Sequence, residues 1–329
     1  MKEYIPAAIT GIGFSTPERN VTNYELEKIV NTTNEWIITR TGIKERRISN
    51  YNEYASTFGT LAAKEALNIA NIPQDEIDLI LVATTTPDKV TPSTACFIKN
   101  NLNIKKAAGF DIQSACAGFC YGLNIATQFI NTGFYKCILV IGVDLLSKYL
   151  NWNDRSTAVI FGDGAGAVVL QSSFKHGVIP GLMGIETEGL NYISIPNNWE
   201  QNFERIPKDQ KYIYMQGKEV FKLVVKIIPN VILKTINKIG LNIKDIDYFI
   251  LHQANQRIIE VIAEKLNVDK EKMISNIERY GNTSAASIPI ALCEAIMTGK
   301  IKKGNKIFIA GFGAGFSWAT SIIEWTKDN

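Results

Sequence analysis

Two hydrophobic periods divide this chain into alternating segments. Short β-branched runs at Leu79–Thr84 and Lys136–Gly142 predict buried strands, because strands inside a parallel sheet carry apolar residues on both faces. The apolar run within residues 1–13 predicts a first strand, and longer stretches between these runs have helical spacing. Strands that alternate with helices in this way predict an α/β fold.

Two parts of the chain repeat each other. Residues 75–82 resemble residues 244–251 at an offset of 169, and residues 138–142 match residues 307–311 at the same offset. Each member of the second pair follows a helix-like segment that ends near Thr-Gly. The two parts therefore share the same β-α-β order.

This duplication predicts how the chain is organised. We expect two pseudo-symmetric β-α-β halves, residues 1–174 and 175–329, in a layered α/β arrangement. A pseudo-twofold axis between the halves would place corresponding loops opposite each other. We therefore look for the chemistry in those loops.

The last strands interrupt the repeat. The glycine-rich runs Gly162–Gly166 and Gly311–Gly315 match at an offset of only 149, so the first half carries 20 extra residues, roughly 143 to 162. These residues include the polar stretch Asn151–Ser156, and the polar segment Pro196–Gln210 is a second long connection. Long connections inside a compact domain more often have a function than a purely structural role.

Composition narrows the function classes. The 329 residues are 46% hydrophobic and carry 35 basic and 32 acidic side chains, a formal net charge of +3. This charge is too small to indicate a nucleic-acid binder, although a local basic patch could attract an acidic partner. Neither a signal-peptide pattern nor a run of ~18 apolar residues is present, so we expect a cytoplasmic protein without a membrane segment.

Five cysteines, an odd number in mostly apolar segments, favour reduced thiols. Cys116 follows a predicted strand and opens a predicted helix, where free N–H groups and the helix dipole lower a thiol pKa. The ordinary alternative is a buried structural cysteine, a reading that suits Cys120 better. The two thiols could share a metal ion, but no second pair has ligand spacing, and we predict no metal site.

Two further loops carry side chains that could react. His252 follows the apolar strand 248–251, and strand ends of α/β folds collect ligands, although a lone histidine is more often structural. His176, the other histidine, lies in a polar turn between the halves and is most simply solvated. Asn282 precedes a helix in the loop that the repeat places opposite Cys116; by itself it would be a capping residue.

The glycine-rich runs do not resemble a nucleotide-binding loop. Neither is followed by the Lys-Ser/Thr pair of a phosphate-binding loop, and each leads into a strand. Because glycine and alanine permit close approach, we expect tight turns whose N–H groups form an oxyanion hole for a thioester carbonyl.

Five motifs in order identify a family. Over its full length the chain resembles the β-ketoacyl-(acyl carrier protein) synthase III family of thiolase-fold condensing enzymes. The motifs are Asn34–Ile43, Ser114–Phe119, Phe161–Gly166, His252–Asn255 and Gly281–Ser287.

The resemblance implies a reaction and its catalytic residues. It implies a homodimer that takes a starter acyl group from acyl-coenzyme A and condenses it with malonyl-acyl carrier protein, releasing carbon dioxide. Coenzyme A is then part of a substrate, and no cofactor is required. Cys116 would be the nucleophile, with His252 and Asn282 as the decarboxylation pair. The N–H groups of Cys116 and Ala314 would form the oxyanion hole.

The resemblance also implies binding residues. Trp36 and Arg155 match residues that sandwich the adenine of coenzyme A, a geometry that suits stacking and cation–π contact. The coenzyme A set is completed by Thr32, Arg40 and Asn255, and the carrier-docking set consists of Lys222, Arg257 and Lys265.

Two positions depart from the family pattern. Thr91 stands where many members have a phenylalanine that crosses the dimer interface and closes the partner's acyl pocket. A smaller gate predicts a deeper or wider pocket. Glu264 stands where a second basic residue is frequent, which predicts altered docking of the acidic carrier.

Other classes fit less well. A degradative thiolase would need a second cysteine in Gly311–Gly315, and an elongating synthase would need a second active-site histidine. A family relative that joins an unusual starter in a secondary-metabolite pathway is the nearest alternative. A scaffold that only binds the carrier protein would not need the Cys-His-Asn set.

Overall fold

The computed structural model describes residues 4–175, 177–195 and 212–328. His176 and the polar segment 196–210 lie outside the described residues. Two sheets form the framework. The first has the strand order β1-β7-β6-β4-β5 and the second β11-β12-β13-β8. The first sheet consists of β1 (Ala7–Ser15), β4 (Leu79–Ala83), β5 (Ala108–Ile112), β6 (Cys137–Leu145) and β7 (Asp163–Ser172). The second consists of β8 (Val178–Ile185), β11 (Tyr248–Leu251), β12 (Lys306–Gly313) and β13 (Ser317–Glu324).

Four strands of the first sheet have the same topology as the four strands of the second. In the first, β4 pairs parallel with β6, and β6, β7 and β1 then pair antiparallel. In the second, β11 pairs parallel with β12, and β12, β13 and β8 pair antiparallel. This common order confirms the predicted α/β fold of duplicated β-α-β units. The division at residues 174 and 175 stays a prediction.

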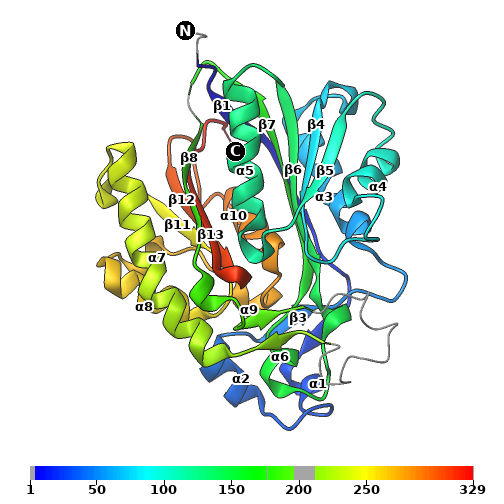
Figure 1. The fold of residues 1–329 in the computed structure, drawn as a ribbon, viewed down its shortest axis with the longest axis vertical. Coiled ribbons are helices and arrows are strands. Elements are labelled where there is room, and N and C mark those ends of the chain that lie inside the picture. The colour runs from blue at the N-terminus through cyan, green and yellow to red at the C-terminus, as the bar shows by residue number, and fades with distance from the viewer. Residues whose placement is uncertain (1–3, 176, 196–211, 329) are drawn as a thin grey trace.

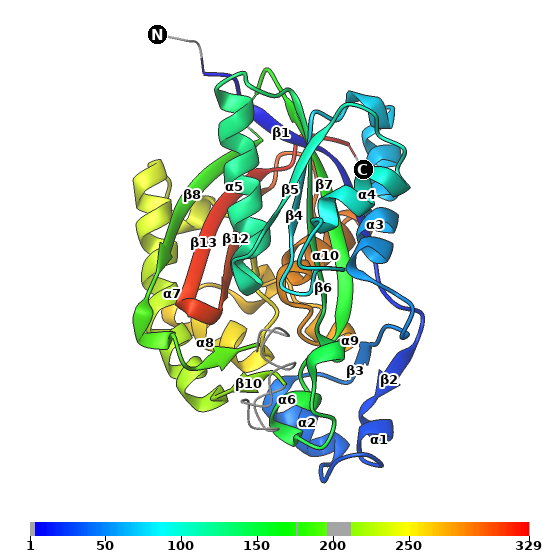
Figure 2. The same cartoon turned by 45° about the vertical axis from the view of Figure 1, so that its right-hand side comes forward.

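Helices and sheets form five layers (Figures 1 and 2). The middle layer contains α5 (Gly118–Asn131) and α10 (Ser287–Met297), which share one apolar core with the inner faces of both sheets. The other face of the first sheet is covered by α3 (Ala55–Ala70) and α4 (Thr94–Asn101), and that of the second by α7 (Gly217–Ile239) and α8 (Gln256–Leu266).

The strands show why both faces are covered. On β4, Leu79 and Leu81 belong to the middle core, whereas Ile80 and Val82 pack beneath α3 and α4. All four side chains are buried because successive residues of a strand point to opposite faces. A continuous apolar run is therefore what a strand between two helix layers requires.

Short elements gather at one end of the sheets, at the bottom of Figure 2. These are β2 (Asn20–Thr22), β3 (Glu45–Arg47), β9 (Ile193–Ser194), β10 (Tyr214–Met215), α1 (Asn23–Leu26), α2 (Asn34–Thr41), α6 (Arg155–Ala158) and α9 (Ile277–Tyr280). The connection from β6 to β7, residues 146–162, packs into this group through Val159. The fully buried Arg46 guanidinium donates to the carbonyl oxygen of Val159 (2.7 Å) and to Asn23 Oδ1 (2.8 Å).

The strand pairing corrects one predicted register. Ile138 pairs with Leu170 and Ile307 pairs with Ile323, so equivalent positions of β7 and β13 differ by 153 residues, not 149. The first half therefore carries 16 extra residues instead of 20. Gly162–Gly166 begins β7, whereas residues 311–313 end β12, so the two glycine-rich runs are not equivalent. The two runs share four identical residues, but this local similarity does not set the register. The register is set by β-strand pairing.

None of the helices in the described ranges is both long enough and apolar enough to span a membrane.

Candidate active site

Cys116 lies where strand β5 turns into helix α5. A short 3₁₀ turn, η2 (Ala115–Ala117), leads directly into α5, so the thiol stands at the helix N-terminus as predicted. Ala115 has a left-handed φ of 45°, which marks a strained turn of the kind found at functional sites. The thiol is partly exposed, whereas Cys120 is fully buried in the core.

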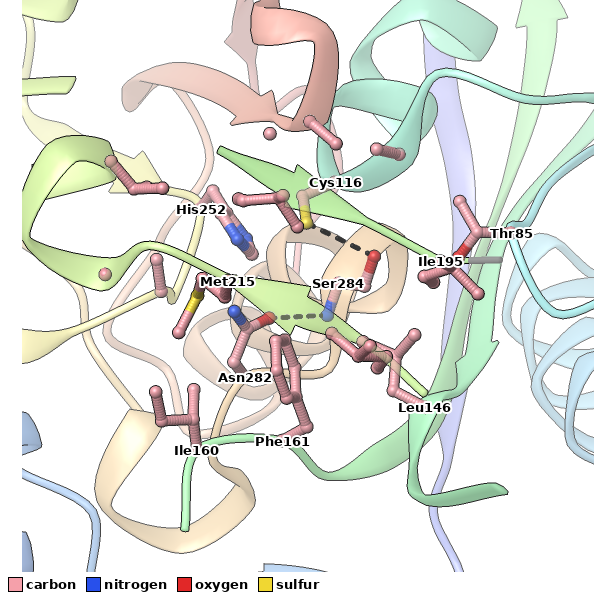
Figure 3. Close-up of a pocket in the computed structure, with 18 of the residues that line it drawn as sticks. Thr85, Cys116, Leu146, Ile160, Phe161, Ile195, Met215, His252, Asn282 and Ser284 are labelled. Carbon is pink, nitrogen blue, oxygen red and sulfur yellow. Dashed lines mark hydrogen bonds between the residues drawn. The ribbon is translucent and has the colours of Figure 1, made fainter. Parts of the chain in front are cut away.

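The thiol opens into a cavity of about 1440 Å³ lined by both halves of the chain. Cys116, His252 and Asn282 all line it, and Figure 3 shows the three side chains around one space. Apolar side chains form one part of its wall. They are Leu146, Ile160, Phe161, Ile193, Ile195, Ile213 and Met215.

His252 follows β11 and is held on two sides. Its backbone N–H donates to the carbonyl oxygen of Ala310 (2.8 Å), and its Nδ1 hydrogen-bonds Ser287 Oγ (2.8 Å). The ring packs edge-on against Phe312. Burial lowers the pKa of His252 to about 3, so the imidazole is neutral. With Nδ1 engaged, Nε2 is the ring nitrogen left to contact a ligand.

Asn282 is fixed by its backbone and by one end of its amide. Its N–H donates to the carbonyl oxygen of Ile160 (2.9 Å), and its own carbonyl accepts from Gly162 (3.0 Å). Oδ1 accepts from the Ser284 N–H (2.9 Å), and in Figure 3 the amide nitrogen faces away from Ser284. The Asn282 amide can therefore donate hydrogen bonds into the cavity. Gly281 has φ 63°, and a side chain there would collide with the carbonyl oxygen of Ile160.

Burial dominates the electrostatics of the thiol. It raises the pKa of Cys116 to about 12; the Asp144 carboxyl adds to the increase, and a hydrogen bond from Ser284 opposes it. The Ser284 hydroxyl lies 3.3 Å from the sulfur. The sequence predicted a lowered pKa from the helix N-terminus. For the resting thiol, desolvation acts in the opposite direction, and the pKa is raised instead of lowered.

The end of β12 packs closely against Cys116. A Cβ on Gly313 would lie 2.8 Å from the Cys116 nitrogen and 2.9 Å from its Cβ, and one on Gly311 would meet the Ala117 Cα at 2.9 Å. Only glycine permits this approach. Ala314 follows in the turn and lines the cavity beside Cys116. Gly162–Gly166, by contrast, packs on α9 and α10, so this run is not the oxyanion turn that the sequence suggested.

Comparison with known proteins identifies the family. Residues 110–185 and 236–325 match the family models for 3-oxoacyl-[acyl-carrier-protein] synthase III and for its C-terminal region. The β-ketoacyl-[acyl-carrier-protein] synthase III of Caldanaerobacter subterraneus subsp. tengcongensis is 46% identical, and the alignment covers 99% of this chain and 100% of the relative. The chain belongs to the synthase III family.

Two solved structures support this assignment. The 3-oxoacyl-[acyl-carrier-protein] synthase III of Aquifex aeolicus is 45% identical with a TM-score of 0.91, covering 97% of this chain and 100% of that one. The priming β-ketosynthase of the R1128 polyketide pathway is 34% identical with a TM-score of 0.95, covering 100% and 99%. The chain therefore has the thiolase-type fold of the family along its whole length.

The residues that the family pattern assigns to coenzyme A lie near the cavity mouth, with differences. Arg155 stacks directly on Trp36, with its guanidinium carbon 4.6 Å from the ring centre. This spacing is too small for an adenine between them, so Arg155 has to move for a sandwich to form. Arg40 also lines the cavity, whereas Thr32 does not.

Asn255 has a structural function that sequence reasoning missed. Its Oδ1 accepts from the Arg257 N–H (2.9 Å) and so caps α8, and its Nδ2 donates to the carbonyl oxygen of Arg40 (2.9 Å). Each end of this amide has one partner, so Asn255 joins α8 to α2 at the cavity wall. The NH2 group keeps a second hydrogen and Oδ1 a second lone pair, so the contact with coenzyme A stays a prediction.

The remaining predicted residues lie at the surface. Lys222 and Arg257 line the cavity mouth on α7 and α8, and Lys265 lies further along α8, where it donates to the carbonyl oxygen of Val225 (2.9 Å). Thr91 is exposed and does not line the cavity of its own chain. It can act as a gate only on another subunit, as the family pattern implies.

Other residues near the thiol were not singled out from the sequence. They are Asp144, Ser284, Ser287 and Gly313. Asp144 could have been recognised from the sequence, because it is a carboxylate inside the apolar strand β6. Ser284 and Ser287 lay in a recognised motif, but their partners come from distant strands. No cluster of three or more potential metal ligands occurs among the residues that the structure describes.

We predict that Gly313→Ala slows acylation of Cys116 by roughly 10²-fold, because the added methyl group displaces the nucleophile and small misplacements cost about that much. Rapid-quench mass spectrometry with an acyl-coenzyme A measures the rate. Thermal unfolding is the control, since overpacking costs about 1–3 kcal/mol of stability. Acylation at the wild-type rate would show that the site accommodates a methyl group at residue 313 without displacing Cys116.

Proposed function

We propose that this synthase III transfers a starter acyl group from acyl-coenzyme A to Cys116 and then condenses it with malonyl-acyl carrier protein, which loses carbon dioxide. The product is a β-ketoacyl-acyl carrier protein, the first intermediate of fatty-acid synthesis. One observation carries the assignment of residues: Cys116, His252 and Asn282, from three separate loops, line a single cavity in a chain of this family.

Acylation begins with attack by the Cys116 sulfur on the thioester carbonyl. The N–H groups of Cys116 and Ala314 stabilise the oxyanion, supported by the close approach of Gly313 to Cys116. Coenzyme A leaves, and the acyl chain occupies the part of the cavity lined by isoleucine and by Met215. An acyl-enzyme divides the condensation into two easier steps.

Decarboxylation is assigned to His252 and Asn282. When the malonyl group loses carbon dioxide, negative charge develops on its thioester oxygen, and two donors stabilise that charge. A neutral His252 suits this role, because Ser287 contacts Nδ1 and leaves Nε2 to donate. Asn282 supplies the second donor through the amide nitrogen that faces away from Ser284. The resulting enolate attacks the acyl carbonyl on Cys116.

Charge at the cavity mouth supports an anionic substrate. Among the residues that the structure describes, six basic side chains and one acidic side chain, Asp111, line the cavity. The basic residues are Arg40, Lys89, Arg155, Lys218, Lys222 and Arg257. Such a field attracts the phosphates of coenzyme A and the phosphopantetheine of an acidic carrier. We assign Lys222, Arg257 and Lys265 to carrier docking, and Thr32, Trp36, Arg40 and Arg155 to coenzyme A.

A homodimer is part of the proposal. The exposed strand β5 pairs with β4 on one side and, in the described parts of the chain, has no strand on its other edge. Phe110 on this strand is 41% exposed, and Val90 beside Thr91 is 85% exposed. The segment that contains Thr91 is tied to this strand, because the Thr94 N–H donates to Asp111 Oδ2 at the end of β5 (2.6 Å). A second copy would cover this edge and bring Thr91 to the partner's cavity.

The free cysteines bear on the location of the enzyme, and the fold likeness and the cavity wall bear on its pathway. Five free thiols suit the reducing cytoplasm, where we place the enzyme. The fold likeness to the R1128 priming β-ketosynthase and the long apolar wall favour one second candidate, a synthase that primes a secondary-metabolite pathway with a longer starter. Activity with short and long starters separates the two.

The nucleophile can be tested directly. We predict that Cys116→Ala abolishes both the acyl adduct and condensation, whereas Cys120→Ala, a change in the buried core, leaves the adduct in place. Intact-mass spectrometry after incubation with a panel of acyl-coenzyme A thioesters detects the adduct, and peptide mapping locates it. A label on any other cysteine would refute the assignment.

The decarboxylation pair has a separate readout. We expect His252→Ala or Asn282→Ala to leave acylation of Cys116 largely intact and to reduce carbon dioxide release from malonyl-carrier protein by ~10² or more, because each change removes one donor to the developing charge. Equal losses in both half-reactions would instead assign the two residues to activation of the thiol or to the fold.

Thr91 sets the expected starter length. Each additional buried methylene gains ~0.8 kcal/mol, so a pocket closed by threonine should accept medium or branched chains at least as well as acetyl. We predict that Thr91→Phe shifts acylation toward short starters when chains of two to about ten carbons are compared. Sedimentation of both proteins serves as the control for dimer formation. A wild-type preference for acetyl would show that other side chains close the pocket.

A further inference from the structure

Asp144 is a fully buried carboxylate near the end of strand β6, one strand away from the nucleophile loop. Its Oδ1 accepts from the turn that follows β4: from Thr85 N (2.7 Å), Thr85 Oγ1 (2.8 Å), Thr84 Oγ1 (3.2 Å) and Thr86 Oγ1 (3.2 Å). A buried charge with this many donors is held in one position. Burial nevertheless raises the pKa of Asp144 above its ordinary value.

The second carboxylate oxygen faces the loop that carries Asn282. Oδ2 accepts from the Ala285 N–H (3.2 Å), and a hydrogen bond from the Ser284 side chain lowers the pKa of Asp144 in opposition to burial. The same Ser284 hydroxyl lies 3.3 Å from the Cys116 sulfur. Ser284 therefore stands between a buried carboxylate and the nucleophile.

Ser284 is held there at a conformational cost. Its φ is 52°, in the left-handed region that residues other than glycine seldom adopt. Its N–H donates to Asn282 Oδ1, which fixes the loop on both sides of the serine. Strain of this kind persists where it serves a function. The hydroxyl has a single hydrogen and two neighbours, so it can donate to Asp144 while accepting from the thiol, or donate to the sulfur once that is a thiolate.

We propose that Ser284 relays the proton of Cys116 to Asp144 during acylation and returns it after condensation. The idea rests on the proposed function and adds two residues to it. As the sulfur attacks the thioester, the S–H bond breaks, Ser284 Oγ takes that proton, and the serine proton passes to Asp144 Oδ2. The carbon–sulfur bond to coenzyme A breaks, and the departing thiolate takes a proton from water.

The return step balances the cycle. The enolate attacks the acyl group on Cys116, the carbon–sulfur bond to the enzyme breaks, and the Cys116 thiolate regains its proton from Asp144 through Ser284. The buried site thus carries one negative charge in the resting enzyme and none in the acyl-enzyme. Without the relay, a thiolate and the Asp144 carboxylate would share a desolvated space, which Coulomb repulsion makes unfavourable.

The other titratable groups around the thiol have different surroundings. His252 is neutral, its Nδ1 is engaged with Ser287, and its Nε2 is assigned to the malonyl thioester. Cys120 is buried in the core on the next turn of α5. Asp111 receives the N–H groups of Thr94 (2.6 Å) and Ala95 (2.9 Å) at the start of α4. Asp144 faces the loop of Ser284 through the Ala285 N–H, and the Ser284 hydroxyl that lowers its pKa also lies 3.3 Å from the sulfur.

Two substitutions test the relay. We expect Ser284→Ala and Asp144→Asn each to slow single-turnover acylation by roughly 10² or more, the usual contribution of a proton acceptor. Alkylation of Cys116 against pH should separate them. Loss of the serine donor raises the apparent thiol pKa, whereas loss of the Asp144 charge lowers it. If Asp144→Asn instead speeds acylation as the thiol pKa falls, Asp144 merely repels the thiolate and the relay is wrong.

Proton uptake gives a readout that a structural role would not change. With a pH indicator, wild-type enzyme should take up close to one proton per acyl group in the acylation half-reaction, because Asp144 keeps the thiol proton while coenzyme A is protonated by solvent. Ser284→Ala should take up none in its slow acylation. Ser284→Ala keeps Asp144 and its backbone partners, so it decides the matter if Asp144→Asn does not fold. Uptake of no proton by an acylated wild type overturns the relay alone, whereas absence of any adduct overturns the proposed function.

Discussion

The active site depends on the close approach of loops from the two halves at the start of α5 and α10. Glycine makes this approach possible. A Cβ on Gly142, in the first half, would lie 2.3 Å from the carbonyl oxygen of Ala285 in the second. Within the first half, one on Gly118 would meet the Ala83 Cβ at 3.0 Å. With Gly311 and Gly313 at the end of β12, backbone packs against backbone around Cys116. Close-packed interiors transmit small displacements, so these glycines determine where Cys116 lies.

Close packing also sets the electrostatics. The surroundings that raise the pKa of Cys116 lower the pKa of His252, because burial penalises whichever form is charged. The resting pair is therefore a neutral thiol and a neutral imidazole, and not an ion pair. A neutral imidazole that keeps one N–H can donate to a developing enolate, whereas a neutral thiol needs a proton acceptor at the moment of attack. This division suggests separate proton chemistry for the two half-reactions.

Much of the framework could be predicted from the chain alone. The apolar runs predicted β4 and β6 correctly, because both faces of these strands are covered. The internal repeat predicted β11 and β12 correctly. Cys116 was found because a strand runs directly into a helix there. These signals are local, and hydrophobic periodicity carries them.

The remaining features required contacts between distant residues. The register of the glycine-rich runs depends on how β7 and β13 pair, and four similar residues could not supply it. The direction of the Cys116 pKa depends on burial by the opposite half. The capping role of Asn255 and the direct stacking of Arg155 on Trp36 depend on side-chain positions that tertiary packing decides. These residues could be named from the sequence, but the side chains and backbone groups that they contact are known only from the fold.

Duplication explains why a nearly symmetric framework yields an asymmetric site. Both α5 and α10 begin with a short 3₁₀ turn, at Ala115–Ala117 and Ser284–Ala286, and each turn starts from a residue with a left-handed φ. The first turn carries Cys116, and the second carries Ser284, which lies 3.3 Å from its sulfur. The connection from β6 to β7 in the first half adds Arg155 to the cavity mouth, and α7 and α8 in the second half add Lys222 and Arg257. The first half thus supplies the thiol, the second supplies His252 and Asn282, and both line the cavity.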